Sequence, residues 1–335
     1  MLAGLVAAAL VVAALVRLPY YVLSPGDATP VEPLIHVQGA QSYQHDGSIL
    51  FTTVSLAGDV NVYAYVHGWL NSNDDVVSRD AITGGTPTKT YNAENIQAMT
   101  DSKTAATKVA LERLGYTVPA HGEGALVVDV AAKGPSDQKL QTGDVITAVD
   151  GTPITLDSQL VSAVHGHKAG DVITFAVSRG GQTIPVPVQA GDDGKGAAKI
   201  GVALQTKNLQ YDFPVQVTID TGKVAGPSAG LAFTLALLDD LTAGNITGGK
   251  KVAVTGTIDV NGMVGPVGGV VQKTAAARKA GAVAFLVPPD EEKDAKAHAG
   301  PMKIMVVKTV DDALAALKQL GGSGVVPKAA APAPH

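Results

Sequence analysis

The sequence predicts a chain of the α+β fold class with more than one domain. Its 335 residues are enough for two domains, and 46% of them are hydrophobic, so a sizeable core can form. Only 4% are aromatic, whereas 38 residues are glycine, which favours layers packed by Ala and Val with many tight turns. Strand patterns and Ala-rich helix patterns follow one another along the chain. An apolar run at the N-terminus adds a predicted transmembrane helix.

Residues 1–23 are predicted to be a membrane anchor. Leu2–Val16 is an uninterrupted apolar run of fifteen residues, and continuing to Leu23 gives the length of about 20 residues that a spanning helix needs. A secretory signal peptide is the alternative, but no positive region precedes the run and no clean small-x-small site follows it. Residues 24–33 contain three prolines and are predicted to be an extended linker.

Residues 34–117 are predicted to hold a strand, two helices and a loop. The strand is expected over residues 48–56 and the first helix over 60–70. A polar surface loop follows over 71–90. A long helix then runs over 91–114 and is ended by Gly115.

Charge and residue usage exclude several function classes. The net charge of −5 shows no basic excess that would indicate a nucleic-acid partner. The absence of cysteine excludes a disulfide framework, a Cys nucleophile and Cys-ligated zinc. No H-E-x-x-H motif occurs, so zinc proteolysis is not supported and no metal is expected. His165 and His167 are interpreted as solvated loop residues, with a metal-binding pair as the alternative.

Residues 118–190 combine a glycine loop with several strands and one helix. The run Gly143-Asp144-Val145-Ile146 continues to Val149-Asp150-Gly151, and a helix over 156–164 and a closing hairpin follow. This pattern resembles a PDZ domain, a β-barrel or sandwich, of the bacterial protease type. The resemblance implies that an extended peptide adds as a strand to a sheet edge.

The implied peptide-binding loop is Gly122-Glu123-Gly124-Ala125, with Leu126 beginning the edge strand. Glu123 departs from the usual loop and is a poor neighbour for a carboxylate, which counts against capture of a free C-terminus. A packing module without a ligand is the alternative.

Ser228 stands where a helix is predicted to begin. Residues 191–199 are expected to be a Gly/Asp linker, and strands over 200–204 and 215–219 lead to the turn. Pro227 suits a first helical turn. A hydroxyl at a helix N-terminus could attack a carbonyl while N–H groups hold the oxyanion. Simple capping of the helix by Ser228 is the alternative.

Lys273 lies one turn into a second predicted helix, which Gly268-Gly269 opens and which is rich in Ala. A lysine removed from water loses its proton more readily and can act as a base near neutral pH. A lysine on a solvated helix face is the alternative.

Three motifs in order resemble the proteolytic domain of Lon proteases. They are Pro227-Ser228-Ala229-Gly230, then Val254-Thr255-Gly256, then Gly268-Gly269 with Lys273. The resemblance implies that Ser228 is the nucleophile, Lys273 the general base and Thr255 the support of the lysine. Backbone around Gly226, Pro227 and Ala229 is implied to hold the oxyanion. Ala225 stands where the family usually has an acidic residue. Met99-Thr100-Asp101-Ser102 also resembles a segment that precedes the catalytic serine in that family.

The remaining elements complete a catalytic part over residues 200–320. Strands are expected over 251–260 and 263–267, around an Asn261-Gly262 turn, and over 282–288 and 304–307. Helices are expected over 289–298 and 310–320, and residues 321–335 are expected to be a disordered tail. Residues 244–251 nearly fit a Walker A motif but lack its final Ser or Thr. They are interpreted as a turn, so no nucleotide cofactor and no ATPase module are expected.

The whole plan resembles the membrane-anchored PDZ–Lon proteases of bacteria. The resemblance implies an extracytoplasmic catalytic part and a protease domain in which residues 34–117 and 200–320 pack around an inserted PDZ domain. It also implies a homo-oligomer, by family a hexamer. The expected function is ATP-independent serine endopeptidase action on flexible or unfolded polypeptides, with the PDZ domain recruiting substrate or regulating access. A non-catalytic PDZ adaptor and a self-cleaving processor of one membrane partner are the alternatives.

Overall fold

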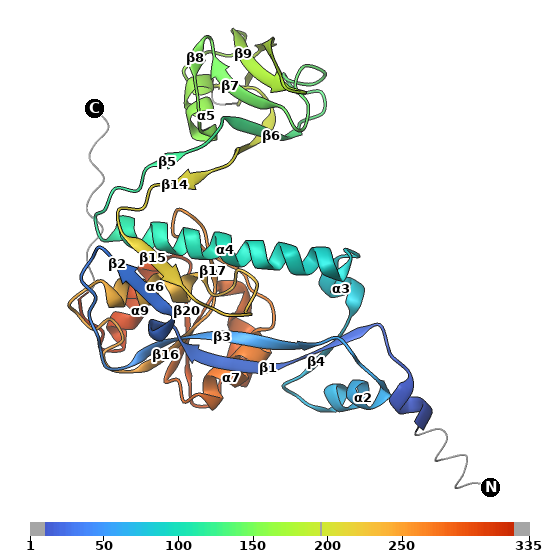
Figure 1. Cartoon of the computed structure of the whole chain (residues 1–335), viewed down its shortest axis with the longest axis vertical. Coiled ribbons are helices and arrows are strands. Elements are labelled where there is room, and N and C mark those ends of the chain that lie inside the picture. The colour runs from blue at the N-terminus through green and yellow to red at the C-terminus, as the bar shows by residue number, and fades with distance from the viewer. Residues whose placement is uncertain (1–10, 195, 325–335) are drawn as a thin grey trace. The chain divides into compact units, whose positions relative to one another are not determined.

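The computed structural model describes residues 11–194 and 196–324, which divide into two compact units. The first unit is built from the segments before residue 118 and after residue 213, and the second from residues 118–213 (Figure 1). Residues 1–10 of the predicted anchor and residues 325–335 of the predicted tail lie outside the described residues.

The first unit is organised on a six-stranded sheet in the order β20-β19-β16-β3-β1-β4. The four strands β20, β19, β16 and β3 run parallel, whereas β1 is antiparallel to both β3 and β4. Their bounds are β1 Tyr20–Pro30, β3 Ser48–Ala57, β4 Asp75–Ser78, β16 Lys251–Val254, β19 Ala284–Val287 and β20 Lys303–Val306.

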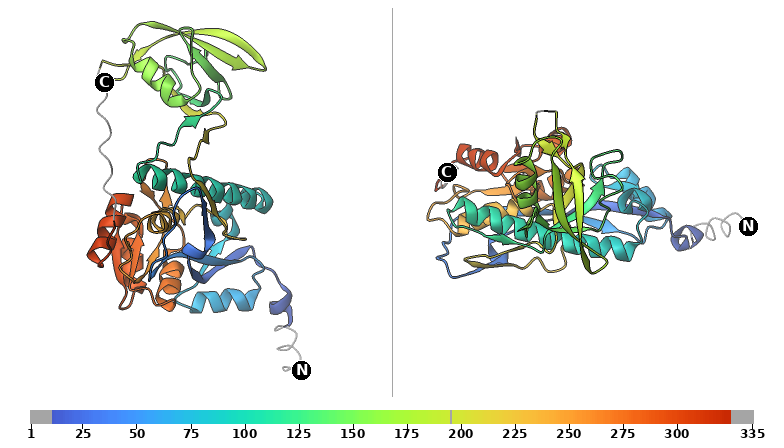
Figure 2. Two further views of the ribbon diagram at one scale, coloured as in Figure 1. Left: turned by 60° about the vertical axis from the view of Figure 1, so that its left-hand side comes forward. Right: turned by 90° about the horizontal axis from the view of Figure 1, so that it is seen from above.

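Helices cover both faces of this sheet, as Figures 1 and 2 show for α4 and α7. Ile49 and Phe51 of β3 join a core with α4 (Thr88–Arg113), α6 (Gly230–Asp240) and α9 (Val310–Gln319). Leu50, between them, joins a core with α7 (Val270–Lys279) and α8 (Glu292–His298). Strands buried on both faces carry apolar residues without alternation, which explains the continuous apolar runs in this part of the sequence.

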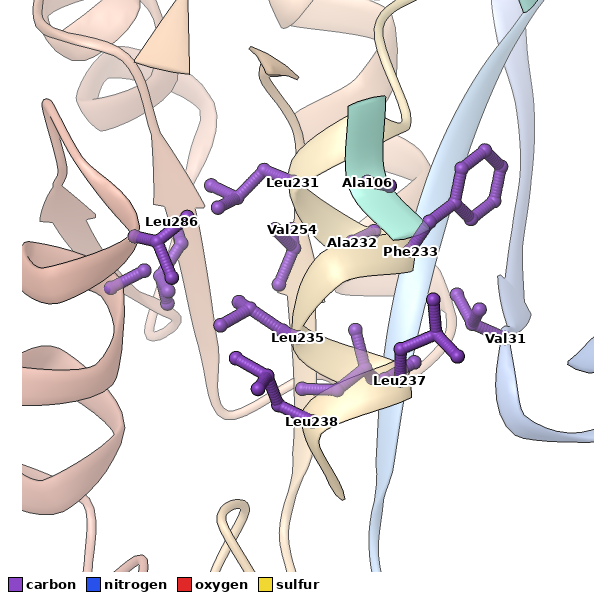
Figure 3. Close-up of a cluster of buried hydrophobic side chains, with 14 of the residues drawn as sticks. Val31, Ala106, Leu231, Ala232, Phe233, Leu235, Leu237, Leu238, Val254 and Leu286 are labelled. Atoms are coloured by element: carbon purple, nitrogen blue, oxygen red, sulfur yellow. The ribbon is translucent and has the colours of Figure 1, made fainter. Parts of the chain in front are cut away.

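Helix α6, which begins two residues after Ser228, is buried along almost its whole length. Its residues from Gly230 to Asp239 are all buried, and side chains leave it in several directions, with Leu235 on one side and Phe233 on another (Figure 3). A helix that is apolar all round belongs in the interior. The turn that precedes α6 is therefore held by a rigid element.

Smaller elements complete the first unit. β2 (Ile35–Gln38) pairs with β15 (Gln216–Ile219), and β17 (Thr257–Ile258) pairs with β18 (Val264–Gly265). The others are η1 Glu32–Leu34, α2 Val62–Leu70, α3 Arg79–Thr83 and η2 Pro289–Glu291. β4 and α3 occupy part of the expected 71–90 loop.

The N-terminal expectation needs a correction. β1 begins at Tyr20, and Tyr21 and Val22 are buried in the sheet, so residues 20–23 do not continue a spanning helix and residues 24–30 are not a linker. The reason is pairing: this segment lies between β3 and β4 and hydrogen-bonds to both. Residues 11–15 are helical. Across the described residues, no helix has the length and apolarity that crossing a membrane requires.

The second unit contains a sheet in the order β10-β9-β7-β6-β13, with β8 paired to β7 and α5 (Asp157–His165) beside it. The strands are β6 Ala125–Val130, β7 Val145–Val149, β8 Thr152–Pro153, β9 Val172–Arg179, β10 Gln182–Gln189 and β13 Val202–Thr206. Two short pairs complete it, β5 (Ala120–His121) with β14 (Gln210–Tyr211) and β11 (Gly191–Asp192) with β12 (Ala198–Lys199).

Two further expectations differ from the structure. The expected linker over 191–199 is largely the β11–β12 hairpin, and β13 does not lead the catalytic part but belongs to the sheet of the second unit. Val202 and Leu204 pack against the core of that unit. The second unit therefore ends at residue 213 and not at 190.

Candidate active site

Ser228 lies in the turn directly before α6. Gly226 opens this turn with a φ of +94°, a left-handed conformation that favours glycine. The Gly226 N–H donates to the Asn95 carbonyl over 2.9 Å, which ties the turn to α4. The hydroxyl of Ser228 is thus presented beside a helix N-terminus, where unpaired N–H groups and the positive end of the helix dipole gather.

Lys273 reaches the same point from the first turn of α7. Its side chain is only 3% exposed. Its Nζ donates to Ser228 Oγ over 2.8 Å and to Thr255 Oγ1 over 3.2 Å. The structure therefore brings together the three side chains that the motifs singled out.

Thr255 directly follows the end of β16, and its hydroxyl contacts both Lys273 and the backbone of Ser228. Its N–H donates to the Leu286 carbonyl of β19 over 3.0 Å, which fixes its place at the sheet edge. Its hydroxyl donates to the Ser228 carbonyl over 3.2 Å, and the Gly256 N–H donates to the same carbonyl over 3.0 Å. Two hydrogen bonds to one carbonyl hold the turn that carries Ser228.

Burial lowers the pKa of Lys273 from an ordinary 10.5 to about 8, and the carboxylate of Glu291 opposes this shift. The cause is desolvation, because a charged ammonium loses its hydration in the interior. An amine with this pKa is neutral in part of the molecules near neutral pH, so it can accept a proton from Ser228. Glu291 is itself buried and its Oε1 accepts from the Val267 N–H over 2.7 Å.

The predicted oxyanion residues are only partly suited to that role. The N–H of Gly226 is engaged by Asn95, and Pro227 has no N–H to donate. Ala229, at the N-cap position of α6, remains as a donor of the predicted set. The first amides of α6 are engaged as well, since the Gly230 N–H donates to the Pro227 carbonyl over 3.3 Å and the Leu231 N–H to the Gly256 carbonyl over 3.2 Å. The candidate oxyanion donor of the predicted set is therefore the Ala229 N–H rather than the whole turn.

Sequence reasoning assigned no contact to Ser102, although it noted the segment that contains it. Ser102 is buried on α4, and its Oγ donates to the Pro227 carbonyl over 2.9 Å across 125 positions of sequence. The resemblance of Met99-Thr100-Asp101-Ser102 to a family segment was the available signal. Its physical meaning is that α4 braces the serine turn.

A cavity of about 840 Å³ opens at Ser228 and Lys273. Its wall includes residues 52–54 of β3, Tyr91 and Met99 of α4, and residues 223–229. Pairing of β3 with β16 ends at Phe51, whereas its pairing with β1 continues to Ala57. β3 therefore brings a strand edge to the cavity. Ala225 lies in this wall, so the wall is uncharged where the family usually has an acidic residue.

The predicted peptide loop of the second unit faces the chain's own residues. The Glu123 N–H donates to the Lys207 carbonyl over 2.9 Å, and the Gly124 N–H donates to the Thr155 carbonyl over 3.0 Å. The strand edge that begins at Ala125 and Leu126 is paired with β13. The expected open edge is therefore closed.

His167 lies beside two carboxylates of the same unit. Its Nε2 lies 3.1 Å from Asp150 Oδ2, with Asp171 on its other side. Within the ranges that the structure describes, no group of three or more His, Cys, Asp and Glu side chains is placed to hold a metal ion.

Comparison with known proteins finds two domain families along the chain. The PDZ domain family matches residues 112–189, and the Lon protease (S16) C-terminal proteolytic domain matches residues 198–319. The Lon protease of Cytophaga hutchinsonii is 30% identical over 169 residues, which is 45% of this chain and 20% of that protein. Lon protease 2 of Bacillus subtilis is 30% identical over 115 residues, 34% of this chain and 20% of its own length.

The Lon protease of Azospirillum brasilense is 41% identical over 93 residues, covering 27% of this chain and 11% of that protein. The chain thus spans a fifth or less of these relatives. A solved PDZ domain of an SdrC-like protein from Listeria monocytogenes is 26% identical and covers 24% of this chain and 87% of its own, with a TM-score of 0.24. The two family matches show that the chain contains a PDZ domain and a C-terminal proteolytic domain of the Lon protease type.

Proposed function

We propose that the chain is an ATP-independent serine endopeptidase in which Ser228 is the nucleophile and Lys273 the general base. The observation that carries this proposal is the 2.8 Å contact between Lys273 Nζ and Ser228 Oγ, made by a buried lysine whose pKa is lowered to about 8. A nucleophile within hydrogen-bond reach of a base with a suitable pKa is the arrangement that covalent catalysis requires.

The proposed reaction uses each of these groups in turn. Neutral Lys273 takes the proton of Ser228 as Oγ attacks a peptide carbonyl, and the Ala229 N–H, at the N-cap position of α6, stabilises the oxyanion. The lysine ammonium then protonates the leaving amine, which leaves an ester on Ser228. Water attacks this ester while Lys273 removes its proton, and the acid product departs as the serine regains a proton. Thr255 orients the lysine throughout.

The substrate is proposed to be an extended peptide segment. The edge of β3 beyond Phe51 faces the cavity and offers backbone groups to which a strand can pair. Only a flexible or unfolded segment can adopt this conformation in the cavity, so flexible tails and unfolded proteins are the proposed substrates. No nucleotide step is needed for such substrates.

Membrane attachment, an extracytoplasmic catalytic part and a homo-oligomer are further parts of the proposal. The apolar run Leu2–Val16 supports attachment. The likeness of the catalytic part to Lon domains supports self-association.

The test is cleavage of casein or a labelled peptide without ATP by wild type, Ser228→Ala and Lys273→Ala. Lys279→Ala, an exposed lysine of the same helix, is the matched control. The proposal expects cleavage by wild type and control only, together with labelling of Ser228 by a serine-directed phosphonate. Undiminished cleavage by both dyad variants would falsify it. A non-catalytic PDZ adaptor, the other candidate, predicts peptide binding without cleavage by any form.

A further inference from the structure

Helix α2 (Val62–Leu70) shows large apolar side chains to solvent. Trp69 is 74% exposed, Leu70 is 70% exposed, and Val66 is exposed as well. These three positions are neighbours on one side of the helix, and we call them the α2 face. The buried residue of the helix is instead its glycine, Gly68. A surface helix usually turns its large apolar residues towards the core, so the reversed arrangement of α2 marks an interaction surface.

The inner side of α2 holds this face towards solvent. Gly68 lies so close to strands β1 and β4 that a Cβ atom there would be 2.9 Å from Val76 Cγ2 and 3.0 Å from Val22 Cγ1. The Tyr65 ring packs edge-on against the Tyr20 ring, with 5.0 Å between the ring centroids. The helix therefore cannot rotate to bury the α2 face without breaking its contact with the sheet.

The α2 face carries no formal charge of its own. Residues 62–70 include no Asp, Glu, Lys or Arg. His67, which lies next to the face, has an imidazole that combines an apolar body with a polar tip. Near the start of the helix, Arg17 Nε lies 4.0 Å from Asp59 Oδ1, so these two opposite charges balance. The surface thus suits an apolar occupant rather than a charged one.

The apolar run Leu2–Val16 reaches the described structure beside α2 (Figures 1 and 2). Residues 11–15 of this run are helical, and Val11, Val12 and Leu15 are exposed. Two segments that show apolar side chains to solvent therefore lie next to each other in the first unit.

Hydrogen bonds fasten these two segments together. Asn61, the N-cap of α2, donates from Nδ2 to the Ala14 carbonyl over 3.3 Å, and its Oδ1 accepts from the Ala64 N–H over 2.9 Å. The Leu18 N–H donates to the Val60 carbonyl over 2.8 Å. One side chain thus holds the end of the apolar run and caps α2. Because a helix of this size is only about 14 Å long, whatever receives the run also lies close to the α2 face.

The residue types of the α2 face fit the boundary between lipid and water. Trp69 is the single tryptophan of the chain. Tryptophan is enriched at membrane interfaces, because its ring is apolar while its indole N–H can stay among the headgroups. Val66 and Leu70 add aliphatic side chains next to the ring. A helix that lies in the interface plane binds more strongly as it buries more apolar area.

We propose that the α2 face lies against a lipid surface, with Trp69 at the level of the headgroups and Val66 and Leu70 at the edge of the acyl chains. This inference rests on the membrane attachment through Leu2–Val16 that is part of the proposed function, and it adds a second contact beside that attachment. Two contacts fix the orientation of the first unit on the membrane, whereas one apolar segment alone leaves the unit free to rotate.

The first test uses Trp69 as its own reporter. Full-length Ser228→Ala protein is reconstituted into phosphatidylcholine vesicles, so that self-cleavage, and with it the proposed peptidase activity, does not enter the result. Flotation of the vesicles in a density gradient measures attachment through the apolar run. Quenching of Trp69 fluorescence by phosphatidylcholine with brominated acyl chains measures lipid contact at α2. The expected result is flotation together with strong quenching.

Charge on the α2 face should remove the lipid contact. Val66→Glu with Leu70→Glu, made in the same protein, should lose the quenching and shift the Trp69 emission to longer wavelength, because a carboxylate is costly among acyl chains. Flotation should persist. The matched control is Val161→Glu with Val172→Glu, two exposed valines of the second unit, which adds the same charge and should leave the quenching unchanged. Thermal unfolding checks that both variants keep the fold.

Salt separates apolar contact from attraction between charges. Since Arg17 lies beside Asp59 and α2 itself is uncharged, quenching should be equal in vesicles with and without phosphatidylglycerol and should not fall at high salt. Quenching that requires phosphatidylglycerol at low salt would mean that headgroup charge holds the first unit, and it would overturn the proposal.

Three further results would overturn it. In the first, the parent protein floats but Trp69 is unquenched and emits like an indole in water, so attachment through the run stands and the α2 contact does not. In the second, Trp69 emits at short wavelength yet brominated lipid does not quench it, which means that a second copy or another segment of the chain covers the face. In the third, the parent protein does not float, which removes the proposed attachment as well. These measurements need no substitution in α2, so they test the proposal even if the glutamate variants fail to fold.

Discussion

Lys273 Nζ lies 2.8 Å from Ser228 Oγ, although Lys273 stands on α7, Ser228 lies in the turn before α6, and the two are 45 positions apart in sequence. The contact is partly buried, and Lys273 is only 3% exposed, so a charged ammonium at this position is poorly hydrated. The short contact and the burial of Lys273 together predict how pH and single substitutions change cleavage and stability.

The pH dependence of cleavage should follow Lys273. The base must be neutral, and its pKa is about 8, so kcat/KM should rise with pH through about 8 and level off above it. The measurement is kcat/KM between pH 6 and 9.5 on a peptide without titratable side chains. A rate that is already constant below pH 7 would exclude this lysine as the base.

Lys273→Met should abolish cleavage and yet stabilise the fold. The folded pKa lies below the ordinary 10.5, so below pH 8 the charge is carried by both states and the folded state bears its desolvation cost. The variant should therefore gain roughly 1–3 kcal/mol at pH 7. As pH rises from 8 towards 10.5 the folded wild type loses its proton first and gains stability, so the difference should shrink. Thermal unfolding at pH 7 and 9.5 measures this, and a variant less stable at pH 7 contradicts it.

Glu291→Gln should move the rising limb of the pH profile to lower pH. The Glu291 carboxylate raises the pKa of Lys273 against the effect of burial, and glutamine removes that charge while keeping an oxygen for the Val267 N–H. Glu292→Gln, on the adjacent helix α8 and paired with Lys296, is the control and should leave the profile in place. A limb that moves the same way in both variants would point to a general charge effect instead.

Thr255→Val should lower kcat by roughly ten- to a hundredfold, because the lysine loses its hydroxyl partner and the Ser228 carbonyl loses a donor. Thr255→Ser should restore most of the rate. The control is Thr274→Val, a buried threonine of α7 whose hydroxyl donates to the Val270 carbonyl of the same helix over 2.7 Å. The measurement is kcat of each variant on one peptide under steady-state conditions. Equal kcat values for Thr255→Val and the control would show that Thr255 does not orient the lysine during catalysis.

Ser102→Ala should slow cleavage several-fold and destabilise the first unit by about 1 kcal/mol, because the half-buried Pro227 carbonyl loses its shorter hydrogen bond and keeps only the Gly230 N–H at 3.3 Å. The same substitution at Ser136, a fully buried serine whose Oγ has no hydrogen-bond partner among the described residues, should change little. Kinetics and denaturant unfolding of the two variants make the comparison. If both behave alike, the Ser102 hydroxyl does not brace the serine turn.

The side chains at the centre of the site could be anticipated because glycine and proline mark the turns that present them. Ser228 and Lys273 each follow such a turn at a helix start, and the order of the motifs linked them. The brace from Ser102 could not be anticipated in the same way, since a hydrogen bond from a helix 125 positions away depends on tertiary packing.

Two strands show where sequence patterns stop being informative. Residues 20–23 are apolar, and a short apolar run fits a helix or a buried strand equally well. Only pairing with β3 and β4 decides for a strand. The sequence predicted a strand over residues 200–204, but its residue pattern does not say which sheet it joins. Its partner β6 lies more than seventy residues earlier by register, Val202 opposite Val130.

The short pairing of β5 with β14 has a consequence for how the chain accommodates its insert. Ala120 pairs with Tyr211, and the Asp212 N–H donates to the Pro119 carbonyl over 2.9 Å, so the entry and exit of the second unit are fastened side by side. Because the two ends of the insertion are paired, the first unit is connected to it as it would be to a tight hairpin. The insertion therefore adds little loop-closure entropy to the cost of folding the first unit. A module joined in this way can be exchanged for a short turn, or for a different module, without redesign of the domain that carries it.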